Sequence, residues 1–344
     1  MCKRFKVSRN RSICSCSSWY GGNTPQMKWE DGSTQSESMD LVREIDQRYP
    51  DNGESLYPED IQSEVINKAE RAFKNIFPSQ SRPSSRAAFL FRYDGSPLWK
   101  DEFEKTLRET DALLGETEGP FFCGDRFTAS DVAWAPFLER YAGQLPCLHE
   151  GLDPRCPDTY PHLHKWYIAM ETRVPAYGCK VRGDLSSWRK VLTMAGFGNA
   201  GNVPGTVATR MEELGLAEKS PISEAEETNQ QALWETFAAT RPYVAASPRE
   251  EAAAVLIRNR EKIAKDASKN CADSAVVGSS ETLDEAMRSL AVLLCDKDRF
   301  SEPIVAACEE RRGTELRSLA AFLDDRICVP RDMGAPSAAW FKRL

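Results

Sequence analysis

The fold follows from one short segment of the sequence, Pro120-Phe121-Phe122-Cys123-Gly124-Asp125-Arg126-Phe127-Thr128-Ala129-Ser130-Asp131. Thr128 is the candidate N-cap of a helix, and Asp131 stands at the third helical position, where its carboxylate can accept the Thr128 backbone N–H. The residues that follow, 132–141, are apolar nearly all round a helix, which predicts a buried helix. Because a buried helix start cannot leave donors unsatisfied, we interpret Asp131 as a folding residue and not as a catalytic acid.

Apolar residues at helical spacing predict further helices on both sides of this one. The expected helices before residue 185 are 59–77, 98–114 and 160–173. Residues 24–48 predict a strand, a turn, a second strand and a helix, with Ser36 or Ser38 as the helix cap. On the central helix, we interpret Glu139 and Arg140 as a structural ion pair. The large side chains Trp134, Tyr141, Trp166 and Met170 are assigned to core packing, with an apolar co-substrate pocket as the alternative.

Residues 206–344 differ from the rest, since they are rich in Ala, Glu and Arg. Ser223-x-x-Glu226 and Ser247-Pro248-Arg249-Glu250 predict capping boxes, the second with Pro at the first helical position. We expect an independent bundle of five or six helices here. The predicted fold class is therefore mainly α.

Composition excludes several classes of protein. The net charge of −7 and the pI of about 5.3 argue against a nucleic-acid partner. The chain has no run of about 18 apolar residues, so we expect no membrane partner. Its eleven cysteines include no CxxC pair, so we expect reduced thiols and no zinc site. The side chains of His162 and His164 diverge on a helix, so we expect no metal there. We expect a cytoplasmic protein. Organelle targeting is the alternative, because residues 1–29 carry six Lys or Arg and no acid.

Three stretches, in order and at matching spacing, resemble cytosolic glutathione transferases, most closely the cysteine-type omega and lambda classes. These stretches are 19–60, Pro120 to Tyr141, and Pro161 to Tyr177. The resemblance implies a partial thioredoxin-like glutathione-binding domain over 19–58 and an all-helical transferase domain over 59–184. The remaining segments are then a basic, disordered tail over 1–18, a Gly-rich linker over 185–205, and a helical domain of unknown function over 206–344.

The resemblance also implies a glutathione site. Pro25 would be a cis-proline, with the backbone of Thr24 offered to the cysteinyl part of glutathione. Glu37 and Ser38 would hold the γ-glutamyl end. A carboxylate can pair with the glutathione ammonium, and a hydroxyl with helix-terminal amides can receive its carboxylate. The alternative is that Glu37 and Ser38 only cap a helix.

The catalytic segment of the resembling classes is not found in this sequence. Those enzymes carry a Cys-Pro motif at a helix start, about thirty residues before the position of Trp19. Cys14 and Cys16 are the candidate nucleophiles here, although they lie too close to Trp19 to begin a helix that leads into a strand. We therefore expect either a truncated sequence or a non-catalytic member of the family.

Two functions follow from the resemblance. The first is a glutathione transferase, which transfers glutathione to a small electrophile or exchanges it with a disulfide through thiolate attack. Glutathione is its co-substrate, and a homodimer is possible. The second is a non-catalytic scaffold, in which the helical half is a docking surface and residues 206–344 bind a protein partner.

Overall fold

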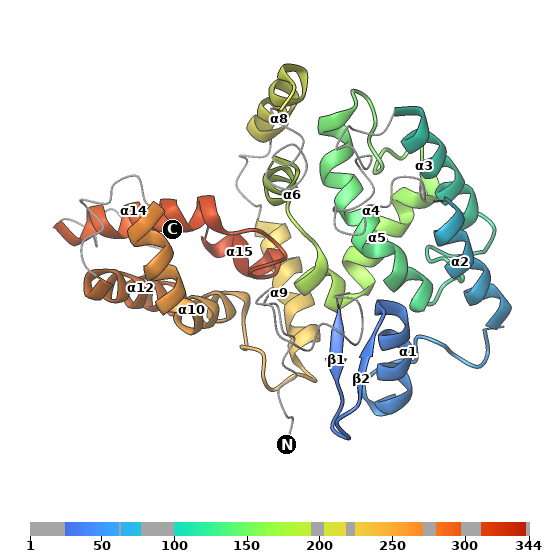
Figure 1. Ribbon diagram of the computed structural model, residues 1–344, viewed down its shortest axis with the longest axis horizontal. Helices are drawn as coiled ribbons and strands as arrows, with labels where there is room; N and C mark the ends of the chain where they lie inside the picture. The colour runs from blue at the N-terminus through green and yellow to red at the C-terminus, as the bar shows by residue number, and fades with distance from the viewer. Residues whose placement is uncertain are drawn as a thin grey trace.

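The computed structural model describes residues 25–61, 63–76, 100–193, 203–217, 224–270, 280–296 and 311–341 (Figure 1). These residues are mostly helical, and the one sheet among them has two short antiparallel strands. The predicted mainly helical fold is therefore confirmed. Four residues that the sequence analysis singled out lie outside the described part of the chain: Cys14, Cys16, Thr24 and Ser223.

A hairpin and a helix form the N-terminal unit. Strands β1 (Gln26–Lys28) and β2 (Thr34–Ser36) are joined by a tight turn, and helix α1 (Ser38–Arg48) and the 3-10 turn η2 (Pro50–Asn52) follow. This is the predicted strand, turn, strand and helix. The turn closes because Asp31 accepts the Ser33 backbone N–H at 2.8 Å, and Gly32 adopts a φ of 87° that glycine reaches without steric cost.

The transferase-like part is built around one central helix. Its elements are α2 (Ser63–Ile76), α3 (Lys100–Leu114), α4 (Ala129–Leu148), α5 (Pro161–Arg173), the π-helical turn η5 (Tyr177–Val181) and α6 (Leu185–Val191). Helix α4 lies among its neighbours and contacts α1, α2, α6 and a helix later in the chain, α8 (Gly205–Ala217). The helices predicted over 59–77, 98–114 and 160–173 correspond to α2, α3 and α5.

Large aromatic side chains fill the space around α4. Trp134, Tyr141 and Trp166 are fully buried, and Met170 is 1% exposed, which confirms core packing over an open co-substrate pocket. The Phe122 ring stacks on the ring of Trp134 with centroids 4.6 Å apart. Buried aromatic side chains of this size each contribute several kcal/mol, so they hold the surrounding helices to α4.

The carboxylate of Asp131 joins the start of α4 to two other segments. Its Oδ2 accepts the Thr128 backbone N–H at 2.9 Å and lies 3.2 Å from the Thr128 hydroxyl, so the capping box forms. Its Oδ1 accepts the Phe122 backbone N–H at 3.2 Å and the Trp166 indole N–H at 2.9 Å. One fully buried side chain thus fixes the loop before α4, the start of α4, and α5.

Six helices follow in the described part of the C-terminal region. They are α8 (Gly205–Ala217), α9 (Glu224–Ala238), α10 (Pro248–Asn270), α12 (Ser280–Cys295), α14 (Arg311–Arg326) and α15 (Ala335–Phe341). Helices α10, α12, α14 and α15 share one apolar core. The Ser247 hydroxyl accepts the Glu250 backbone N–H at 3.3 Å, so Ser247 caps α10 as predicted.

Two of these helices, α8 and α9, contact the transferase-like part. Val207 of α8 belongs to the core around α4, and Arg210 donates to the carbonyl oxygens of Cys147 and Leu148, each at 2.9 Å. Helix α9 contacts η5. The division of the chain at residue 206 stays a prediction, but the expected bundle is not independent of the helices before it.

Removing the Asp131 carboxylate tests its role in holding the fold. Asp131→Ala leaves buried donors of Thr128, Phe122 and Trp166 without an acceptor, so we expect a loss of about 3 kcal/mol or more in the free energy of unfolding. Asp125→Ala, which removes an exposed carboxylate paired with Arg173, is the matched control and should cost less than about 1 kcal/mol. Equal losses in urea unfolding of the two variants would refute the role.

The same carboxylate predicts a pH dependence of stability. Burial raises the pKa of Asp131 from 3.8 to about 6, against the hydrogen bonds that favour its charged form. The folded state therefore holds the proton more tightly than the unfolded chain, and this contribution to stability is lost as the pH rises through 4 to 6. Relative to Asp131→Asn, the wild type should lose about 2 kcal/mol between pH 4.5 and 7.5. A difference that stays constant or grows with pH contradicts this assignment.

Candidate functional site

The hairpin register brings the described candidate residues together. Gln26 pairs with Ser36, so the residues just outside that pair, Pro25 and Glu37, lie at the same end of the hairpin. Helix α1 begins at the next residue, Ser38. Pro25, Glu37 and Ser38 are all exposed at this end, away from the turn at 29–33.

Glu37 has an unusual backbone. Its φ of 74° and ψ of 115° make it the one non-glycine residue with positive φ among the described residues. It is also the N-cap of α1, with no side-chain capping hydrogen bond, so the predicted cap by Ser36 or Ser38 is wrong. A backbone conformation of this kind costs about 1–3 kcal/mol and persists only where the surroundings enforce it.

The groups at this end are suited to a zwitterionic ligand. The first amides of α1 point toward its N-terminus, where the helix dipole favours a bound carboxylate. The Ser38 hydroxyl lies at the same place, and the exposed Glu37 carboxylate can pair with an ammonium group. An amino acid end, with both charges on one carbon, matches this pair of features.

Contacts at the last turn of α1 and in the hairpin fix α1 relative to the hairpin. The Arg48 guanidinium lies 4.2 Å above the Trp29 ring, and the Trp29 indole donates to Gln35 at 3.0 Å. After α1, the Leu56 carbonyl accepts the Ala129 backbone N–H at 3.0 Å. The segment after α1 is therefore hydrogen-bonded to the start of α4, next to Asp131, and α1 itself contacts α4.

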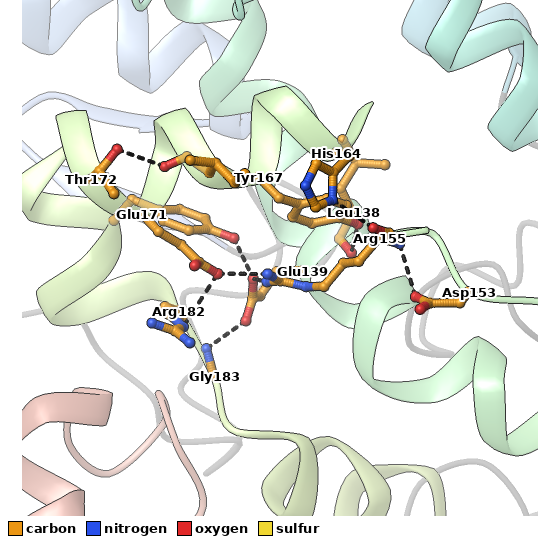
Figure 2. A network of polar contacts seen from close by, with 12 residues as sticks. Leu138, Glu139, Asp153, Arg155, His164, Tyr167, Glu171, Thr172, Arg182 and Gly183 are labelled. Carbon is orange, nitrogen blue, oxygen red and sulfur yellow. Dashed lines mark hydrogen bonds and ion pairs between the residues drawn. The ribbon is translucent and has the colours of Figure 1, made fainter. Parts of the chain in front are cut away.

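A second polar cluster lies deeper, between α4, α5 and η5 (Figure 2). Glu139, 4% exposed, accepts the Tyr177 hydroxyl and the Gly183 backbone N–H, the latter at 2.7 Å. Arg155 lies between two carboxylates, 3.9 Å from Glu139 and 2.7 Å from Glu171. The predicted pairing of Glu139 with Arg140 is wrong, because adjacent helix residues face different directions.

Charges in this second cluster are matched, which indicates a structural role. Burial lowers the pKa of Arg155, but Glu171 and Glu139 outweigh it and hold that pKa above its usual value. Burial, reinforced by Glu139, raises the pKa of Tyr177 well above its usual range, so its hydroxyl keeps its proton. Sequence reasoning missed Arg155 because it lies in a loop without periodicity.

The described cysteines and histidines form no reactive site near α1. All six described cysteines are free. Burial raises the pKa of the Cys123 thiol, and raises that of Cys179 to about 11. Hydrogen bonds from Thr159 lower the pKa of the Cys156 thiol. Cys156 lies before the first residue of α5, however, whereas it is the last residue of α5, Arg173, that packs on Phe121 near the start of α4. No group of three or more metal-ligating side chains occurs among the described residues. His164 instead contacts the Arg155 carbonyl at 2.7 Å.

Comparison with known proteins finds similarity over part of this chain. Residues 69–169 match the family model described as the glutathione S-transferase C-terminal domain, which supports a relation of this region to that family. The chain is 27% identical over 141 residues to glutathione S-transferase L2, chloroplastic, of Arabidopsis thaliana, covering 41% of this chain and 43% of the relative. It is 30% identical over 106 residues to Protein IN2-1 homolog B of Oryza sativa subsp. indica, covering 30% and 39%.

The chain spans about two fifths of the length of these curated relatives. No solved structure matches it significantly. No helix in the described part of the chain has the length and apolar character needed to cross a membrane.

Strain at Glu37 can be measured directly. Glu37→Gly relieves the positive φ, so we expect the free energy of unfolding to rise by about 1 kcal/mol. Glu44→Gly, the same change inside α1, should instead lower it by about 1 kcal/mol. A loss of stability in both variants would show that the Glu37 backbone is unstrained.

Proposed function

We propose that this chain is a glutathione transferase-like protein that binds glutathione at the N-terminus of α1. The observation that carries the proposal is the convergence of Pro25, Glu37 and Ser38 at one end of the hairpin, with a strained residue at the helix start. Strained backbone of this kind clusters at ligand sites. The transferase domain over 69–169 supports the same ligand.

The bound ligand would lie with its γ-glutamyl end on α1. Its ammonium pairs with Glu37, and its carboxylate receives the Ser38 hydroxyl and the amides of α1. Thr24 and Pro25 would receive the cysteinyl part, as the resemblance implies. The exposed end of the hairpin leaves the ligand thiol open to a second substrate.

Transfer is the further step of this proposal. The glutathione thiolate would attack an electrophilic carbon, forming an S–C bond while the leaving group departs, or attack a disulfide and release one thiolate. Within the described residues, no thiol with a lowered pKa lies near α1, so an enzymatic nucleophile would come from Cys14 or Cys16. This same observation favours the alternative, a glutathione-binding scaffold without transfer activity. A cytoplasmic location and a homodimer remain part of the proposal.

Retention on immobilised glutathione tests the site. We expect the wild-type chain to be retained, and Glu37→Ala to bind about tenfold more weakly or worse, because a charge-assisted contact is lost. Glu30→Ala is the matched control, since Glu30 is an exposed carboxylate at the turn end of the same hairpin. Its retention should equal that of the wild type.

Two outcomes would refute the proposed site: no retention of the wild type, or equal retention of Glu37→Ala. Turnover separates the enzyme from the scaffold. With free glutathione and a chromogenic chloronitrobenzene, conjugate formation that Glu37→Ala reduces supports the transferase. Retention without conjugation or disulfide exchange supports the scaffold.

A further inference from the structure

Five residues, η5, connect the transferase-like part to the helices that follow it. Toward α4, the Tyr177 hydroxyl donates to the buried Glu139 carboxylate. Toward the C-terminal helices, Lys180 lies 3.1 Å from Glu251 near the start of α10. Helices α9 and α15 both contact this turn. In Figure 1, α9 and α6 lie between the two groups of helices.

Lys180 sits among aromatic rings and one nearly buried carboxylate. Its ammonium lies 4.8 Å from the Trp234 ring and 5.8 Å from the Phe237 ring. The Glu251 side chain is only 10% exposed, and it also accepts the Ala245 backbone N–H at 3.3 Å. Without Lys180, that carboxylate would remain nearly buried with no cation beside it, which is strongly unfavourable.

The backbones meet without space for a side chain. A Cβ at Gly334, just before α15, would lie 1.7 Å from the Cys179 carbonyl oxygen of η5. Because the obstacle is backbone, it cannot rotate away. Gly178 is also close to α9, since a Cβ there would lie 2.5 Å from a side-chain methyl carbon of Leu233.

Helix α6 adds a third contact beside the turn. The Val329 backbone N–H donates to the buried Ser187 hydroxyl at 2.8 Å. Lys190 donates to the carbonyl oxygens of Asp324 and Asp325 at the end of α14, at 2.9 and 2.6 Å. Both partners come from residues more than a hundred positions later in the chain.

We propose that η5 holds the C-terminal helices against the transferase-like part, and that the ion pair of Lys180 with Glu251 stabilises this contact. The two apolar cores of the wild type then unfold in a single cooperative transition. The charge of Lys180 holds this docked state, so its loss releases residues 328–341 and α10 while α4 stays folded. This inference is independent of glutathione binding.

Hydrogen–deuterium exchange of the full chain tests whether η5 holds the C-terminal helices in place. Lys180→Met keeps the apolar stem and removes the charge, and we expect the amides of 328–341 to exchange at least about tenfold faster, with α4 unchanged. Lys165→Met, an exposed lysine on α5, is the matched control and should leave both regions unchanged. Adding Glu251→Gln to Lys180→Met should restore part of the protection from exchange, because the nearly buried carboxylate charge of Glu251 is then removed as well.

A second pair of variants does not depend on charge. Gly334→Ala should accelerate exchange in 328–341 in the same way, whereas Gly205→Ala, which has open space around it, should not. Three results would overturn the proposal. They are unchanged exchange of 328–341 in Lys180→Met, equal effects in the controls, and two separate unfolding transitions in the wild type.

Discussion

The buried carboxylate of Asp131 is the constraint on which the transferase-like fold depends. It satisfies donors at the Thr128 cap, in the preceding loop at Phe122 and, 35 residues later in the chain, on α5 at Trp166. None of these donors can reach water, so the carboxylate must stay where it is. The candidate site depends on it indirectly, because the segment after α1 is hydrogen-bonded to the first residue of α4.

Stability and function make opposite demands at the two ends of this arrangement. At Asp131 every hydrogen bond favours folding, and the residue offers nothing to a ligand. At Glu37 the side chain is exposed and the backbone is strained, and folding alone does not favour the backbone strain. A residue that costs stability in an otherwise well-satisfied structure is a reason to look for a ligand there.

Local patterns in the sequence predicted most of the helices and the capping box, since both depend on residues within a few positions of one another. The positive φ of the N-cap Glu37 could not be predicted, because it arises where the hairpin and the helix meet. The partner of Glu139 was missed because Arg155 approaches from a loop after α4 has ended. The docking of α8 and α9 depends on contacts such as Arg210 with Cys147, which leave no periodic signal.

The most direct test of this account is a carbon-13 NMR titration of the Asp131 carboxyl in the full chain, assigned by its absence from Asp131→Asn. Burial should raise the pKa of this carboxyl to about 6, from the 3.8 of an exposed aspartate, even though its four hydrogen-bond donors favour the charged form. A carboxyl that titrates at or below 3.8 would contradict this account, because burial would then not dominate the environment of Asp131.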